Sequence, residues 1–436
     1  MNKLNKAKEP NKKPTSTLSE RDRTVIWHPL TQHKKQRDML LIVKAKGCWL
    51  YDENGRSYID AISSWYTAVY GHCNDNLVKA IRNQAQQLDQ IIFSGFTHQP
   101  AVELAEKLLS ILPDKMGKVF YNDNGSTATE IGIKMALQFH HNQGHDRDTL
   151  IAFEEGFHGD TFGAMSVSGL SVYNGAFEKH FIKVLRLPKP NGKNNAQVLN
   201  ILEKFIQNHS IAGFIYEPLI QGAAGMKTYD KGGLEDIIKR CKAENIICIA
   251  DEVMTGFGKT GTCFASEQIN TQPDVICLSK ALTAGMMPMG VTACQDYIYE
   301  AFYDDDIAKG LFHAHTYSGN ALACAVALEA IRLYESAFIQ QQLRHIAEAH
   351  AHFKVKFDDH SKIKSIRHIG VILALDLDLD IDTYSDMRDK LYQFFMDRGI
   401  YLRPLGNTVY IVPPYIIKRE ELSQIYNGLE AVLDFI

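Results

Sequence analysis

The chain has 436 residues, of which 45% are hydrophobic and 22% are charged, proportions that exclude a largely disordered or fibrous protein. Its 47 lysines and arginines nearly balance its 51 aspartates and glutamates, so the formal net charge is −4 and no broad basic face is expected. We therefore expect no nucleic-acid partner, and no membrane partner either, because no stretch approaches the roughly 18 apolar residues of a membrane helix.

The first segment, residues 1–23, is rich in lysine and lacks an apolar run. Secretory signals need such a run, so we expect a solvated tail. The eight cysteines form no CxxC pair, and zinc ligation usually needs tighter, paired spacing. These patterns predict reduced thiols in a cytoplasmic protein.

Residues 24–70 predict a small unit that is too short to fold alone. The stretch GCWLYDENGRSYIDAIS (47–63) has the Asp-Glu-Asn-Gly signature of a turn between two strands. The apolar run at 39–43 predicts a buried strand.

The middle of the chain alternates short apolar runs with helical patterns. The runs that predict strands are VFYND (119–123), LIAFEE (150–155), AGFIYEP (212–218), IICIADE (246–252), DVICLSK (274–280) and MGVTACQ (289–295). Helices are predicted at 128–140 and 232–245, where apolar residues recur at helical spacing. This alternation indicates an α/β fold with a largely parallel sheet, whose ligands gather at the carboxyl ends of the strands.

The C-terminal part, from about residue 325, predicts a second α+β unit. A long helix pattern at 321–336 leads into mixed helices and strands, including GVILALDL (370–377) and NTVYIVPPY (407–415). No internal repeat is present in the sequence.

Two candidate catalytic residues follow predicted strands. Lys280 comes directly after DVICLS, where burial would lower its pKa and make it an amine nucleophile. Asp251 ends IICIAD, where a carboxylate could pair with a protonated ring nitrogen of a cofactor. Taken alone, Lys280 is more simply explained as a lysine that opens a helix, and Asp251 could equally be a helix cap or a solvated strand end.

The start of the first predicted helix of the sheet region is a candidate anion site. Gly125 and Ser126 precede an amphipathic helix, whose first N–H groups and dipole favour a phosphate. A capping box formed by Ser126 with Thr129 or Glu130 would explain the same residues without a ligand. The segment lacks the GxxxxGK and GxGxxG fingerprints.

Three further clusters could touch a ligand. FEEGFHGDTFGAMS (153–166) is an aromatic, glycine-rich turn that could stack on a planar group. HAHTYSGN (313–320) groups two histidines without a carboxylate or cysteine, so we expect no metal there. Arg403 lies in an apolar context, where a guanidinium usually pairs with a carboxylate of protein or substrate. Together with the amine, the acid and the helix start, these features describe a pyridoxal-phosphate site.

The residues of these motifs and their order along the chain resemble those of the class III aminotransferases of PLP fold type I. The resemblance runs from about residue 26 to about residue 414 and includes IADEVMTGFGKTG, DVICLSKALTAG, GFHGDTFGAMS and HTYSGNALACAVALEA. It implies a homodimer with shared active sites. It also implies a large PLP-binding domain at 71–325 with a mostly parallel seven-stranded sheet, and a small α+β domain built from 24–70 and 326–436.

The resemblance also implies roles for individual residues. Lys280 would carry the cofactor and move the substrate proton, and Asp251 would keep the pyridine nitrogen protonated. Gly125 and Ser126 would bind the phosphate, with His315 and Thr316 from the neighbouring subunit. Phe157 would stack on the cofactor ring, and Glu217 would lie close to the cofactor. The residues expected at the substrate are Trp65, Tyr66, Phe157, Lys280, Ala314 and Arg403.

The segments WHPxTQ, SSW and RPLG…VYIVPPYII resemble members of the family that aminate 8-amino-7-oxononanoate in biotin synthesis, with S-adenosylmethionine as the donor. Four positions depart from that pattern, which has Tyr, Trp, Tyr and Arg where this chain has Leu30, Tyr66, Phe157 and Lys259. These departures leave lysine open as an alternative donor. The sequence is also compatible with an ω-amino acid aminotransferase, an aminomutase or decarboxylase, or a non-catalytic binding protein built on the same fold.

Overall fold

A computed structural model of the chain describes residues 17–35, 39–113, 115–171, 173–379 and 385–436. Most of the expected N-terminal tail, residues 1–16, lies outside the described residues. Helix α1 (Leu18–Val25) begins after the cap residue Thr17, and none of its side chains is buried.

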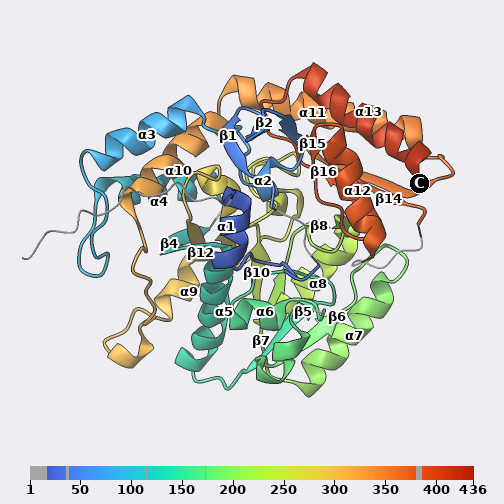
Figure 1. The fold of residues 1–436 in the computed structure, drawn as a ribbon. Helices are drawn as coiled ribbons and strands as arrows, with labels where there is room; N and C mark the ends of the chain where they lie inside the picture. The colour runs from blue at the N-terminus through green and yellow to red at the C-terminus, as the bar shows by residue number, and fades with distance from the viewer. Residues whose placement is uncertain (1–16, 36–38, 114, 172, 380–384) are drawn as a thin grey trace, which may run out of the picture.

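A seven-stranded sheet occupies the middle of the molecule (Figure 1). Its order is β4 (Met116–Asn122), β12 (Gly290–Gln295), β11 (Val275–Leu278), β10 (Ile247–Asp251), β7 (Ile211–Tyr216), β5 (Thr149–Phe153) and β6 (Val184–Leu187). Only β12 runs antiparallel to its neighbours, so the prediction of an α/β fold with a mostly parallel sheet is confirmed.

Both faces of this sheet are buried, as its continuous apolar strands require. In β10, Cys248 and Ala250 belong to one hydrophobic cluster, while Ile249 between them belongs to the other. On the Ile249 face, Gly132 of helix α5 (Gly125–Asn142) lies so close that an added Cβ would be 3.2 Å from the Ile249 side chain. The glycine therefore lets α5 approach the middle of the sheet.

The remaining helices of this region surround the sheet. They are α3 (Asp75–Ala85), α4 (Gln99–Ile111), α6 (Phe162–Val167), α7 (Asn195–Asn208), α8 (Lys231–Ala243), α9 (Asp296–Glu300) and α10 (Ala321–Tyr334). Short 3-10 helices lie at Gly175–His180, Ala265–Gln268, Lys280–Thr283 and Ile307–Lys309, and a small ribbon pairs β8 (Ile220–Gln221) with β9 (Lys227–Thr228).

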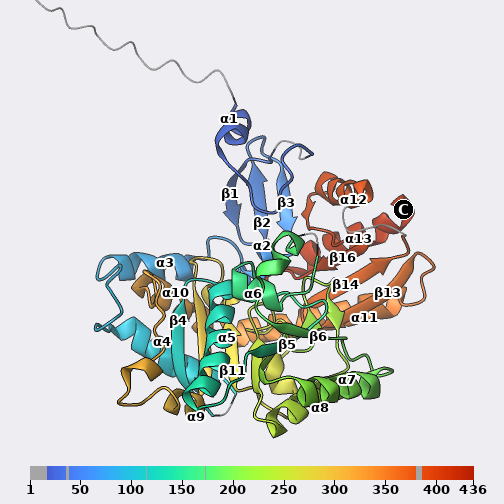
Figure 2. The same cartoon turned by 90° about the horizontal axis from the view of Figure 1, so that it is seen from below.

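Segments from both ends of the chain meet in a four-stranded sheet. Strands β1 (Ile42–Lys46), β2 (Trp49–Asp52) and β3 (Ser57–Asp60) form a meander, and β15 (Ile400–Tyr401) pairs in parallel with β3. Figure 2 shows β1, β2 and β3 projecting from the main body together with α1.

The other C-terminal elements form a three-stranded sheet with helices around it. They are α11 (Ala337–Phe357), β13 (Ile363–Ile369), β14 (Ile372–Leu377), α12 (Asp386–Asp397), β16 (Thr408–Ile411) and α13 (Arg419–Phe435).

The prediction of a buried strand at 39–43 is wrong. Strand β1 begins only at Ile42, and the side chains of Leu40, Ile42 and Val43 are exposed in the single chain. An apolar run predicts that a segment is buried, but it does not tell whether the chain itself or a partner buries it.

Candidate active site

Adjacent parallel strands bring three predicted residues to one edge of the sheet. Asp251 is the last residue of β10, Glu217 follows the end of β7, and Lys280 lies just beyond β11. Because β7, β10 and β11 are neighbours, their carboxyl ends share one edge, where ligands of such sheets bind.

Lys280 has a left-handed backbone conformation, and its amine has no ion-pair partner in the part of the chain that the structure describes. Its φ of 50° lies in the left-handed region, which is uncommon for non-glycine residues. Its Nζ atom lies 5.1 Å from the centre of the Tyr66 ring, and no described carboxylate forms an ion pair with it. Burial lowers the pKa of Lys280, although Asp251 and Glu217 oppose this shift. A lowered pKa makes the amine available as a nucleophile.

The carboxylate of Asp251 is held from two sides. Its Oδ2 atom lies 2.7 Å from Nδ1 of His158, and its Oδ1 atom accepts a hydrogen bond of 3.0 Å from the backbone N–H of Val253. Both side chains are buried, and among the described residues Nε2 of His158 has no hydrogen-bond partner. The sequence motifs gave His158 no role, although it stands next to Phe157 in the aromatic, glycine-rich turn.

Glu217 organises the turn that carries Phe157. Its carboxylate accepts hydrogen bonds from the backbone N–H groups of Phe157 at 3.0 Å and Gly222 at 2.8 Å. Burial raises the pKa of Glu217 to about 7, while His158 opposes the shift. The Phe157 side chain itself stays 43% exposed, so one face of its ring is free to stack on a ligand.

The predicted anion site lies at the first turn of α5, but its cap differs from the expected one. Asn124 is the cap residue and exchanges hydrogen bonds with Thr127, so a capping box of Ser126 with Thr129 or Glu130 is wrong. A Cβ on Gly125 would lie 2.7 Å from a methyl group of Val253, so the position needs glycine. Such a helix start fits the phosphate of PLP.

Ser126 lies in that first turn as well. Its hydroxyl oxygen accepts a hydrogen bond of 3.2 Å from the backbone N–H of Asp160. The neighbouring Gly159 has a φ of 128°, and a Cβ there would collide with the Ser126 side chain. The turn after Phe157 therefore packs directly against the helix start.

Trp65 and Tyr66 lie on a left-handed turn, α2 (Ser63–Tyr66). Its four residues have φ values of 48°, 44°, 69° and 69°. This conformation costs about 1–2 kcal/mol per residue. Hydrogen bonds hold it, from the Ser63 hydroxyl to the Val412 carbonyl and from the Ser64 hydroxyl to Asp60, each 2.7 Å long.

The two aromatic side chains of this turn have different surroundings. The hydroxyl of Tyr66 donates a 2.9 Å hydrogen bond to that of Tyr410, and both rings are buried. Trp65 is 43% exposed, and the Arg403 guanidinium lies 5.0 Å from its ring centre. No described protein carboxylate forms an ion pair with Arg403. Its charge is thus available to a carboxylate ligand.

His315 and Thr316 lie on the loop between the Ile307–Lys309 turn and α10, together with Ala314. Nδ1 of His315 is 3.8 Å from Oδ2 of Asp123, which stands two residues before Gly125. Nε2 of His315 is 2.8 Å from Nε2 of His313, and within the described residues no cluster of His, Cys, Asp and Glu could hold a metal ion.

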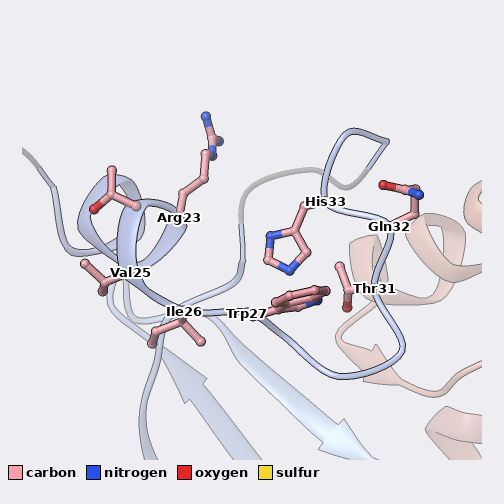
Figure 3. Close-up of a pocket in the computed structure, with 8 residues that line it drawn as sticks. Arg23, Val25, Ile26, Trp27, Thr31, Gln32 and His33 are labelled. Atoms are coloured by element: carbon pink, nitrogen blue, oxygen red, sulfur yellow. The ribbon is translucent and has the colours of Figure 1, made fainter.

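Two of the departing positions lie in contrasting places. Lys259 is fully buried, and its Nζ atom donates a 3.2 Å hydrogen bond to the carbonyl of Gly256. Leu30 is exposed on the segment after α1. Close to it, residues 23–27 and 31–33 line an open cavity of about 430 Å³ (Figure 3). Trp27 in that cavity is 90% exposed, and none of the predicted site residues lines it.

Comparison with known proteins identifies close relatives over nearly the whole chain. A family model for class III aminotransferases matches residues 31–433. The adenosylmethionine-8-amino-7-oxononanoate aminotransferase of Synechococcus elongatus is 40% identical, over 94% of this chain and 99% of its own length. The protein of the same name from Geobacter sulfurreducens is 35% identical, over 95% and 97% of the two chains.

Solved structures give the same picture of the fold. The crystal structure of the protein of that name from Methanocaldococcus jannaschii has a TM-score of 0.91 and 32% identity, covering 96% of this chain and 98% of its own. An omega transaminase from Pseudomonas jessenii, solved in complex with PMP, has a TM-score of 0.90 and 28% identity over the same shares. Among the described helices, none is both long and apolar enough to cross a membrane.

Proposed function

This chain belongs to the class III aminotransferases, and we propose that it transfers an amino group to 8-amino-7-oxononanoate to form 7,8-diaminononanoate, with S-adenosylmethionine as the donor. Members of this family depend on PLP. The observation that carries the proposal is the meeting of the Lys280 amine, the Asp251–His158 pair and the Gly125 helix start at one edge of the sheet.

The residues at this edge fit each part of the cofactor. PLP, when bound, supplies an electron sink that stabilises negative charge on the substrate carbon. Asp251, fixed by His158, would hold a proton on the ring nitrogen. The backbone N–H groups at Gly125 and Ser126 would bind the phosphate, and Phe157 would stack on the ring. Lys280 would carry the cofactor and move the proton between substrate and cofactor.

The same site has to accept two unlike substrates in turn. Arg403 would bind the carboxylate of the keto substrate. No described carboxylate of the protein pairs with its charge, and its guanidinium lies beside Trp65, another residue expected at the substrate. Trp65, Tyr66 and Ala314 would line the substrate path. Lysine remains the alternative donor, and a direct comparison of the two donors separates them.

We further propose a cytoplasmic homodimer with shared active sites, in which His315 and Thr316 reach the phosphate of the neighbouring subunit. The exposed apolar side chains of Val25, Trp27 and Val43 support the presence of a partner surface. The division into a large domain at 71–325 and a small domain from 24–70 and 326–436 is supported by the pairing of β15 with β3.

Two experiments test the reaction and the site. Purified enzyme is mixed with 8-amino-7-oxononanoate and either S-adenosylmethionine or lysine, and 7,8-diaminononanoate is measured. Product with S-adenosylmethionine supports the proposal, product with lysine alone overturns the donor, and no product with either overturns the reaction.

The second experiment compares Lys280→Ala with the control Lys183→Ala. Lys183 is an exposed lysine that pairs with Asp148. We expect Lys280→Ala to lose turnover and the absorbance band of covalently bound PLP, while Lys183→Ala keeps both. A fully active Lys280→Ala enzyme would contradict the assigned site.

A further inference from the structure

Three side chains form a continuous hydrogen-bonded row beside the start of α5. Nζ of Lys134, in the middle of α5, lies 2.9 Å from Nδ1 of His313, and Nε2 of His313 lies 2.8 Å from Nε2 of His315. The row ends near Asp123, whose Oδ2 atom is 3.8 Å from Nδ1 of His315. One helix and one loop are thereby joined by imidazole rings.

The chemistry of the donors gives this row one direction. A lysine ammonium can only donate, so Nδ1 of His313 must accept and the ring must be neutral with its proton on Nε2. That proton is donated to Nε2 of His315, which therefore carries its own proton on Nδ1. This Nδ1 is buried and has no hydrogen-bond partner among the described residues, and Oδ2 of Asp123 lies 3.8 Å from it, so the last proton lies next to the carboxylate.

The loop that this row holds also carries Thr316. The Thr316 carbonyl accepts a 2.7 Å hydrogen bond from Nε2 of Gln90, and the His315 backbone N–H donates a 3.2 Å hydrogen bond to the Ser318 hydroxyl. These contacts hold the C-terminal part of the loop, and the hydrogen bond between Lys134 and His313 ties the loop to α5.

We infer that Lys134 and His313 are positioning residues, which hold the 313–316 loop in place for phosphate binding through a one-way hydrogen-bond chain. The functional part of this inference rests on the proposed function, in which Thr316 contacts the cofactor phosphate of the neighbouring subunit. The chain itself does not, because it is defined by atoms of the protein alone.

The charged groups around His313 favour the neutral ring. Burial lowers the pKa of His313, and Lys134 and His315 lower it further, while Glu130 on α5 opposes them. The ring of Phe120 on β4 packs against it, 6.4 Å between centres, and adds no charge. The neutral form is therefore kept at neutral pH. Acidification below the lowered pKa protonates Nδ1, removes the acceptor for Lys134 and breaks the chain.

Nitrogen NMR of histidine-labelled apoenzyme tests the chain without the cofactor. At about pH 8 we expect the proton of His313 on Nε2 and that of His315 on Nδ1, with the two rings assigned by the variants His313→Gln and His315→Gln. In Lys134→Met, whose site is exposed, we expect His313 to populate both tautomers. A wild-type His313 that carries its proton on Nδ1, or is charged at that pH, overturns the chain.

PLP affinity of the apoenzyme tests the positioning role. His313→Phe keeps a ring but removes both nitrogens. We expect its Kd for PLP to rise about tenfold at pH 8, which is the effect of losing about one charge-assisted hydrogen bond. His313→Gln keeps a donor that cannot titrate, so its affinity should fall less than that of the wild type between about pH 8 and pH 5.5. Unchanged affinity in His313→Phe overturns the role. If the tautomers are as expected but the enzyme shows no transamination, the result contradicts the proposed function and leaves the hydrogen-bond chain intact.

Discussion

Nδ1 of His158 lies 2.7 Å from Oδ2 of Asp251, and both side chains are buried at the carboxyl end of β10. A buried carboxylate is costly unless its charge is paired and hydrogen-bonded. Here one oxygen faces an imidazole and the other a backbone N–H. The acid is therefore held in one orientation before any ligand binds, which is the arrangement expected of a group that must face a cofactor ring.

Replacing Asp251 with Asn tests this arrangement. The amide has no charge with which to keep the cofactor ring protonated, so we expect kcat to fall about 100-fold or more, comparable to the loss of one preorganised electrostatic contact. The measurement is steady-state kcat together with the spectrum of bound PLP. Asp236→Asn, at an exposed position of α8, is the matched control and should behave as wild type. An Asp251→Asn enzyme with more than half the normal kcat would remove Asp251 from the mechanism.

A second prediction concerns the close approach of α5 to β10. In Gly125→Ala the new methyl group would lie 2.7 Å from Val253, so the first turn of α5 must shift. We expect the Kd for PLP to rise tenfold or more, since about 1.4 kcal/mol of lost phosphate binding gives that factor. Gly175→Ala is the control, because its added Cβ meets no atom of the described residues within 4 Å. Equal PLP affinity in both variants, measured by titration of apoenzyme, would contradict a phosphate site at Gly125.

Six of the seven strands of the central sheet were predictable, because each is a continuous apolar run that alternates with helical patterns. The edge strand β6 (VLRL), which contains Arg186, was not predicted. A strand that is buried on both faces needs apolar side chains at successive positions, so it can be recognised in the sequence as a short continuous apolar run. The rule that ligands bind at the carboxyl ends of the strands then predicted that Lys280 and Asp251 lie at one edge, and the family resemblance added Glu217. The apolar run at 39–43 shows where this kind of prediction fails, since most of its side chains are exposed in the single chain.

Other parts of the site depend on contacts between distant segments and have no local signature. His158 and Asp251 are 93 residues apart in the sequence, so the residues around either one do not predict their contact. The left-handed turn of α2 is formed by non-glycine residues and held by Asp60 and by Val412 from the C-terminal part. Sequence propensity favours the opposite handedness there.

A third prediction concerns Arg403, which lies over Trp65 and has no described protein carboxylate as a partner. A charge-assisted hydrogen bond contributes about 1.5–3 kcal/mol, so Arg403→Leu should raise the KM for 8-amino-7-oxononanoate about 10- to 150-fold. Arg403→Lys keeps the charge without the planar fork and should give an intermediate KM. The KM of the amino donor is the internal control. A change confined to the donor would assign Arg403 to the other substrate.

The last prediction uses the buried amine of Lys259. Burial, reinforced by the nearby Lys280, lowers the pKa of Lys259 to about 7, while Glu252 opposes the shift. In the unfolded chain the amine titrates near the ordinary lysine value of about 10.4. Between these two values the unfolded state binds a proton that the folded state does not, so wild-type stability falls as pH decreases through this range and levels off below about pH 7.

Lys259→Met removes this titration while keeping a side chain of similar length. We therefore expect the variant to be more stable than wild type at pH 7, and the difference to shrink by about 2–3 kcal/mol when the pH is raised from 7 to 9, since one pH unit in this window corresponds to about 1.4 kcal/mol. Denaturant unfolding at the two pH values measures it, with the exposed-site variant Lys183→Met as the control. A stability difference independent of pH would show that Lys259 stays charged in the folded protein. A charged Lys259 beside Lys280 would in turn favour the neutral form of the Lys280 amine.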